Sequence, residues 1–179
     1  MSKFTDRLVT VISDASLYSG PDNKPVHRVI GAAWWYKSQF VTHKSSAHTV
    51  LDQKVDSNAG ELWGISQAMA CLISKHEKFG RMNMVVQCDN LSALACLSTL
   101  GAKWSKNSKT ASPLVNPSEA ILDILDEIKS MKKGLIYLKH VKGHSNIRDG
   151  RHSVNRMVDT MAKEARVSGQ RQINKKKTK

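Results

Sequence analysis

The sequence predicts an α/β fold with a five-stranded mixed sheet, in which three antiparallel strands are followed by two parallel ones and helices cover both faces. Two observations lead to this prediction: strand-like segments come first, and helical and strand patterns then alternate along the rest of the chain. A length of 179 residues suits one domain with a single core. We expect that domain to span residues 1–168, with a basic tail over residues 169–179.

The first three strands follow from alternation and from turn signals. Residues 7–14 alternate, so that Leu8, Thr10, Ile12 and Asp14 share one face and Asp14 closes the strand. After the turn-rich residues 19–23, residues 29–36 and 46–51 are predicted to be the second and third strands. Together the three segments indicate an antiparallel meander.

The middle of the chain predicts a helix, a strand and a second helix. Apolar residues recur at helical spacing from Ala59 to about Lys75, and Glu61 lies one turn before Ile65 on the same face. Residues 84–88 form a short apolar strand that ends at Asp89. Residues 91–100 resume a helical pattern, which makes a strand–helix–strand crossover the expected connection.

The last third predicts a basic loop, two helices and one strand. Residues 101–113 are too polar for core, and Asn116 is predicted to cap a helix that runs to about Met131. Residues 134–141 form the last strand, and apolar spacing over residues 154–165 marks a final helix that carries Asn155 and Asp159. The lysine-rich residues 169–179 lack apolar periodicity and are predicted to be disordered.

Charge and composition narrow the class of partner. The net charge of +13, from 28 Lys and Arg against 15 Asp and Glu, indicates a polyanionic partner, with nucleic acid the leading candidate. Cys71, Cys88 and Cys96 show no metal-binding spacing and are predicted to be small buried residues in a reducing compartment. Because no apolar targeting or membrane-spanning segment is evident, we expect a cytoplasmic protein without a membrane partner.

Four acidic residues stand where an α/β fold would bring carboxylates together. Asp14 and Asp89 lie at predicted strand ends, Glu61 at a helix start and Asp159 on the final helix. Hard divalent cations prefer oxygen ligands, and two such ions about 4 Å apart stabilise the charges that develop when a phosphodiester is hydrolysed. His140, His144 and His152 could suggest zinc, but no cysteine accompanies them.

In its order of elements and in its motifs, the chain resembles the type-one ribonuclease H family. The resemblance covers roughly residues 7–167 and is carried by Ser13–Asp14, Ser57–Leu62, Gln87–Asn90, Val141–His144 and Asn155–Asp159. Each motif alone is only weakly specific for the family. The whole series in this order is much more specific. A ribonuclease H-like fold is therefore expected.

The resemblance implies an endoribonuclease that cuts the RNA strand of RNA–DNA hybrids and leaves 3′-hydroxyl and 5′-phosphate ends. It implies a monomer with two Mg²⁺ ions, or Mn²⁺ in their place. Asp14 would bridge the ions, Glu61 and Asp89 would complete one site, and Asp159 would complete the other. His144 is implied to assist proton transfer or product departure.

Substrate contacts are expected from small polar and basic residues. Asn58 is the best match for a sugar or base-edge contact, while Asn90 and Asn155 are helpers that could equally be capping or turn residues. A basic handle that grips the hybrid is expected from Lys103, Trp104, Lys106 and Lys109, unless this is a solvated loop with Trp104 packed on the body. Lys142 and the tail lysines would add salt-sensitive affinity.

Two departures from the family pattern and two alternative functions stay open. Residues 15–27 lack the glycine-rich run common after the first aspartate, and the segment between His144 and Asp159 carries an insertion over residues 145–154. A junction resolvase-like DNA nuclease would share the fold and metals, but a helix-borne Glu61 with a loop His144 favours ribonuclease H. A non-catalytic nucleic-acid-binding module is disfavoured, because clustered carboxylates repel one another without a metal.

Overall fold

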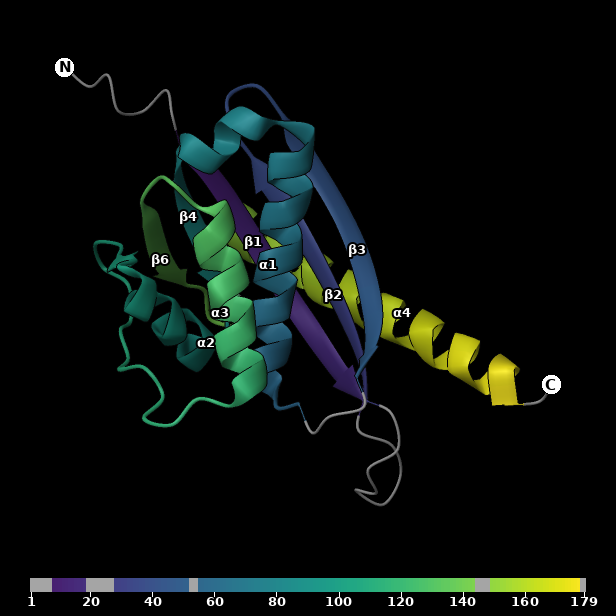
Figure 1. The fold of residues 1–179 in the computed structure, drawn as a ribbon. Coiled ribbons are helices and arrows are strands. Elements are labelled where there is room, and N and C mark those ends of the chain that lie inside the picture. The colour runs from purple at the N-terminus through teal and green to yellow at the C-terminus, as the bar shows by residue number, and fades with distance from the viewer. Residues whose placement is uncertain (1–7, 19–27, 52–54, 144–148, 178–179) are drawn as a thin grey trace.

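The structure is a computed structural model that describes residues 8–18, 28–51, 55–143 and 149–177 (Figure 1). Its sheet has the strand order β3-β2-β1-β4-β6-β5. The strands are β1 (Leu8–Tyr18), β2 (Arg28–Lys37), β3 (Thr42–Leu51), β4 (Asn83–Cys88), β5 (Lys103–Trp104) and β6 (Ile136–His140). The β1–β2 and β2–β3 pairs are antiparallel, and the β1–β4, β4–β6 and β5–β6 pairs are parallel.

This arrangement confirms the predicted mixed α/β sheet, with one strand more than expected. The additional strand is β5, whose two residues pair with Tyr137 and Leu138 at the edge of the sheet. Two residues are too few to show the alternation by which a strand is recognised in a sequence. The segment that was predicted to be a loop therefore begins as an ordered edge strand.

Helices cover both faces of the sheet. They are α1 (Ser57–Lys75), α2 (Leu91–Leu97), α3 (Glu119–Met131) and α4 (Gly150–Lys177), with the short 3-10 helices η3 (Glu77–Arg81) and η4 (Ser98–Leu100). In Figure 1, α1 and α3 lie in front of the sheet and α4 crosses behind it. In the described part of the chain, no helix is both long enough and apolar enough to span a membrane.

The helix starts follow side-chain capping. Asp56 caps α1 and accepts a hydrogen bond from Ala59 N over 2.8 Å. The predicted cap of α3 was wrong by two residues: Ser118, not Asn116, accepts from Ile121 N, over 3.4 Å. Pro117 consequently precedes the cap instead of opening the helix.

Each face of the sheet buries its own apolar cluster. The larger cluster lies under α1 and α3 and includes Val9 and Val11 of β1. The smaller one lies under α4 and consists of Ile12, Ala33, Val158 and Ala162. Because side chains alternate along a strand, Ile12 and Asp14 of β1 both face α4.

The end of β1 differs from the prediction in a way that matters for Asp14. The strand does not stop there but continues to Tyr18, paired with Val29 of β2. Its pairing with β4, in contrast, ends at Ile12 and Gln87. Asp14 therefore lies just past the point where β1 loses its parallel neighbour, which opens the sheet beside it.

The predicted disordered tail was also wrong for residues 169–177, which extend α4. Gly169 packs so closely on β2 and β3 that an added Cβ would lie 2.7 Å from His48 Cδ2 and 2.8 Å from Val29 Cγ1. One turn later, His48 Nε2 and Gln172 Oε1 are 3.2 Å apart. Contacts with β3 and the high helix propensity of Lys, Arg and Gln together explain the extension.

Candidate functional site

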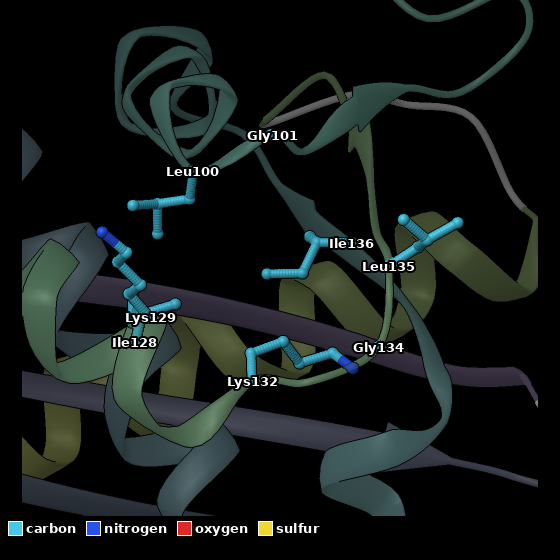
Figure 2. Close-up of a pocket in the computed structure, with 8 residues that line it drawn as sticks. All are labelled: Leu100, Gly101, Ile128, Lys129, Lys132, Gly134, Leu135 and Ile136. Atoms are coloured by element: carbon cyan, nitrogen blue, oxygen red, sulfur yellow. The ribbon is translucent and has the colours of Figure 1, made fainter.

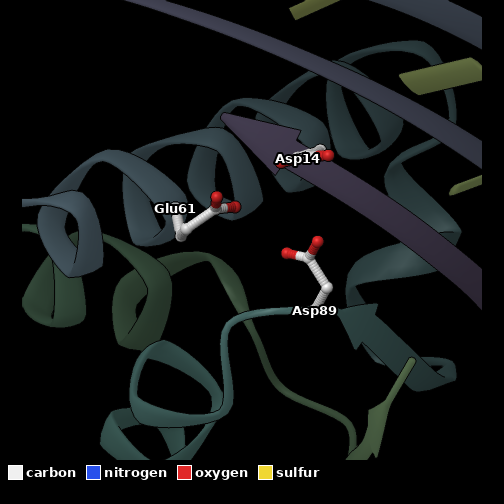
Figure 3. A group of neighbouring side chains, drawn as sticks. All are labelled: Asp14, Glu61 and Asp89. Atoms are coloured by element: carbon white, nitrogen blue, oxygen red, sulfur yellow. The ribbon is translucent and has the colours of Figure 1, made fainter. Parts of the chain in front are cut away.

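Three of the four predicted carboxylates converge where β1 and β4 part. Asp14 comes from β1, Glu61 from the first turns of α1, and Asp89 follows the last residue of β4. Each offers an oxygen within 4.8 Å of the oxygens of the other two (Figure 3). The carboxyl end of β4 and the start of α1 meet here, as the sequence predicted, whereas β1 contributes Asp14 from within the strand, just past its last pair with β4.

Burial raises the pKa of two carboxyl groups in this cluster. Asp14 and Glu61 are only 5% and 7% exposed, and Asp89 is half-buried. Burial, followed by the charges of Asp89 and Asp159, raises the pKa of Asp14 to about 7. Burial and then the charges of Asp14 and Asp89 raise the pKa of Glu61 well above its ordinary value. A hard divalent cation fits such a site, because its charge would offset the repulsion and its preferred ligands are carboxylate oxygens.

Asp159 lies beside this cluster and not within it. The negative charge of Asp159 on α4 contributes to the raised pKa of Asp14 on β1, so the two carboxylates are close enough to interact electrostatically. Its Oδ2 accepts a hydrogen bond from Lys163 Nζ over 2.7 Å, one helical turn further on. The structure therefore places the fourth predicted acid next to the other three, in an ion pair.

The backbone and a thiol orient two of the carboxylates. Ala15 N donates to Asp14 Oδ1 over 2.8 Å. The Cys88 thiol donates to Glu61 Oε2 over 3.5 Å, and its sulfur accepts from Asn90 N over 3.3 Å. The sequence predicted Cys88 only as a small buried residue. Its position directly before Asp89 was the one feature in the sequence that could have indicated a role at the carboxylate site.

Two further residues hold Asp89 from the side of β6. A Cβ at Gly143 would overlap Asp89 Oδ2 and lie 3.1 Å from its Cγ, so only glycine leaves room for this carboxylate. His140 Nε2 lies 3.0 Å from the carbonyl oxygen of Asp89. In the sequence, His140 was considered only as a zinc ligand together with His144 and His152. In the structure, the ring of His140 contacts Asp89, whereas the ring of His152 contacts Asp149 over 2.7 Å. His144 lies outside the described residues, as do residues 145–148 of the insertion.

The asparagines predicted to contact substrate have different surroundings. Asn58 is half-buried in the first turn of α1. Asn90 caps α2 by accepting from Ala93 N over 2.9 Å, which is the capping role left open by the sequence. Asn155 is only 4% exposed on α4, and its Oδ1 has no hydrogen-bond partner among the residues that the structure describes.

The predicted basic handle is anchored to the edge of the sheet. Lys103, Lys106, Lys109 and Lys142 are exposed, whereas Trp104 packs partly buried against the core. Ser105 N donates to Leu138 O over 2.8 Å, and Ser108 Oγ accepts from His140 N over 2.9 Å. His140 therefore contacts the lysine-bearing segment through its backbone N–H and the main-chain carbonyl of Asp89 through its ring.

A small hollow of about 80 Å³ lies elsewhere and shares no residue with the carboxylates (Figure 2). It is lined by Leu100, Gly101, Ile128, Lys129, Lys132, Gly134, Leu135 and Ile136. Ile136 opens β6, while His140 at the other end of that strand contacts Asp89. Lys132 Nζ donates to Met82 O, and burial lowers its pKa to about 8.

Known structures share this architecture at low sequence identity. A crystal structure of the Prototype Foamy Virus protease–reverse transcriptase aligns with 92% of this chain, at 13% identity and a TM-score of 0.59, and this chain spans 21% of that one. The N-terminal RNase H domain of Rv2228c from Mycobacterium tuberculosis aligns over 93% of this chain and 98% of its own, at 11% identity and a TM-score of 0.58.

A third similar structure contains nucleic acid. LC11-RNase H1, isolated from compost by a metagenomic approach, has been crystallised in complex with an RNA/DNA hybrid. That structure aligns over 90% of this chain and 98% of its own, at 15% identity and a TM-score of 0.55. These likenesses show a common fold.

Sequence comparison gives the family. A search of curated proteins found no match. The family model described as RNase H, in contrast, matches residues 6–167, which include the three converging carboxylates and Asp159. This chain therefore belongs to the RNase H family.

Proposed function

We propose that this protein is a ribonuclease H that hydrolyses the RNA strand of RNA–DNA hybrids. The observation that carries the proposal is the convergence of Asp14, Glu61 and Asp89 in a chain of the RNase H family. The complex of LC11-RNase H1 with an RNA/DNA hybrid supports the choice of substrate. The net charge of +13 supports a polyanionic one.

The proposed cofactors are two Mg²⁺ ions, with Mn²⁺ as a substitute. Asp14, Glu61 and Asp89 would hold one ion, and Asp14 with Asp159 would hold the other. Such ions supply a nucleophilic water and stabilise the charges on the attacking and leaving oxygens. Attack by water on the phosphorus, with the bond to the 3′-oxygen breaking and that oxygen leaving, would give 3′-hydroxyl and 5′-phosphate ends.

The protein's own groups would position these parts. Ala15 N and the Cys88 thiol fix oxygens of Asp14 and Glu61 before substrate arrives. Exposed lysines of the segment over residues 103–109 would contact phosphates, and their anchor through His140 keeps them in register with Asp89. His144, on the resemblance alone, is proposed to assist proton transfer or product release.

The decisive experiment compares substrates and metals. Purified protein would be incubated with a labelled RNA–DNA hybrid, single-stranded RNA and duplex DNA, each with Mg²⁺ or with EDTA. We expect cleavage of the hybrid alone, only with Mg²⁺, and products with 5′-phosphate ends. Preferred cleavage of duplex DNA would indicate the resolvase-like alternative, and tight binding of the hybrid without cleavage would indicate a binding module.

Two substitutions connect the activity to the site. Asp14→Asn and Asp89→Asn should abolish cleavage while hybrid binding is largely kept, because an amide binds a divalent cation far more weakly than a carboxylate. Asp126→Asn, an exposed acid on α3, is the matched control and should cleave like the wild type. Normal turnover by Asp14→Asn would exclude this cluster as the metal site.

A further inference from the structure

A cationic side chain of α4 contacts the strand that carries Asp14, on the side of β4 and β6 away from the lysine-bearing segment. Along α4, Lys163 and Arg166 follow Asp159 by four and seven residues and so share one side of the helix with it. Lys163 pairs with Asp159, whereas Arg166 Nε donates to Ser16 Oγ of β1 over 3.0 Å. Arg166 therefore contacts the same strand that carries Asp14.

Arg166 is held in place from two sides. Its guanidinium carbon lies 5.6 Å from the centre of the Tyr18 ring, and its Nε is occupied by Ser16. Among the residues that the structure describes, Nη1 and Nη2 have no hydrogen-bond partner and no carboxylate pairs with the side chain. Arg166 as a whole residue is half-buried. A fixed guanidinium without a counterion presents two parallel donors, which match the oxygens of a phosphate.

The position of Arg166 along β1 gives the spacing. Asp14, Ser16 and Tyr18 share one face of the strand, so Ser16 lies about 7 Å beyond Asp14. Phosphates on one strand of a duplex advance by about 3.4 Å each along the helix axis. Because successive phosphates are also displaced around that axis, a strand whose scissile phosphate lies at Asp14 would bring a phosphate about one or two nucleotides away to Arg166.

We infer that Arg166 binds a backbone phosphate of the nucleic acid about one or two nucleotides from the cleaved bond. This inference rests on the proposed function and deepens it. Because β1 and the edge strand β5 lie on opposite sides of β4 and β6, the nucleic acid is held on both sides of the carboxylates.

The test measures binding without cleavage. In an Asp14→Asn background, the affinity for an RNA–DNA hybrid would be measured by fluorescence anisotropy over a series of salt concentrations. Arg166→Met keeps the stem of the side chain and should weaken binding about tenfold, with a salt slope reduced by about one. Arg166→Lys should recover only part of the loss, because an ammonium cannot bind in a bidentate manner.

Arg171→Met is the matched control, an exposed arginine of the same helix, and should change affinity less than about twofold. Thermal unfolding of each variant separates lost binding from lost folding. Unchanged affinity in Arg166→Met would overturn the inference and indicate a purely structural arginine. An equal loss in Arg171→Met would overturn it in favour of binding by diffuse positive charge.

A chemically altered substrate tests the position. Hybrids with one uncharged methylphosphonate linkage, moved stepwise from the cleavage site, should lose about tenfold in affinity at a single position about one or two nucleotides away. At that position Arg166→Met should cause no further loss, since both changes remove the same contact. Additive losses at every position would refute the contact. Cleavage by the wild type tests the proposed function separately. If the wild type cleaves no hybrid in Mg²⁺, the proposed function fails. If it cleaves the hybrid but the Arg166 variants bind like the parent protein, only the contact by Arg166 is refuted.

Discussion

The thiol of Cys88 lies 3.5 Å from Glu61 Oε2 and donates a hydrogen bond to it inside the core. Burial raises the pKa of this thiol well above its ordinary value, so the sulfur keeps the proton that it donates. The same sulfur accepts from Asn90 N. One side chain thus connects the helix that carries Glu61 to the loop that begins with Asp89.

Removal of this thiol should weaken both the fold and the metal site. Cys88→Ala loses a buried hydrogen bond and leaves a small void, so we expect a loss of about 1–2 kcal/mol in the free energy of unfolding. It should also raise the Mg²⁺ concentration for half-maximal binding, while Cys88→Ser, which keeps a donor, should do so less. Cys96→Ala, at a buried cysteine outside the carboxylate cluster, is the control for volume. Isothermal titration with Mg²⁺ and urea denaturation measure the two effects, and equal Mg²⁺ affinities in both alanine variants would refute the role.

Local patterns in the sequence were sufficient for the parts of the site that lie on regular elements. Alternation in β4 and the helical spacing of α1 placed Asp89 and Glu61 at the correct ends of their elements, and alternation in β1 placed Asp14 on the correct strand, although that strand continues to Tyr18. The parallel crossover between β1 and β4 then brings those ends together. Three carboxylates could therefore be expected to meet before any coordinates were known.

The remaining features depend on contacts between distant segments, which periodicity does not report. The contact of His140 with Asp89 joins residues 51 positions apart, and Gly143 matters only because Asp89 lies against it. The extension of α4 past Gly169 depends on His48 of β3. In each case tertiary packing overrides or completes a local preference.

Gly143 offers a test of how closely Asp89 is confined. In Gly143→Ala, the new Cβ would overlap Asp89 Oδ2, and the carboxylate must move away from its present position. We expect Mg²⁺ affinity to fall about tenfold or more while the free energy of unfolding changes by less than about 1 kcal/mol. Gly150→Ala is the control, since nothing lies within 4 Å of a Cβ there. Calorimetric titration distinguishes the variants, and wild-type Mg²⁺ binding by Gly143→Ala would contradict the expectation.

Gly31 should be needed for the approach of α4 to β2. A Cβ at this position would overlap the backbone of Ala162 and lie 2.8 Å from Arg166 Cα, so Gly31→Ala must push the helix away. We expect a loss of about 3 kcal/mol in the free energy of unfolding. Gly60→Ala makes the opposite prediction: its Cβ would have ordinary contacts at 3.8 and 3.9 Å, and alanine favours the helix by about 1 kcal/mol. Urea denaturation of both variants tests the pair, and similar midpoints would show that the helix is not confined at Gly31.

The raised pKa of Asp14 predicts that the metal-free protein loses stability as the pH rises. Its folded pKa of about 7 exceeds the ordinary 3.8, so the folded state binds the proton more tightly than the unfolded state does. This contribution is complete below about pH 4 and is lost progressively up to about pH 7, by a few kcal/mol in total. In EDTA, unfolding should therefore be easier at about pH 8 than at about pH 5, and Mg²⁺ should restore stability at the higher pH by binding the folded carboxylates. Asp14→Asn should flatten both responses. Thermal unfolding across this pH range measures them, and equal stability of the wild type in EDTA at both ends would contradict the coupling of these carboxylates.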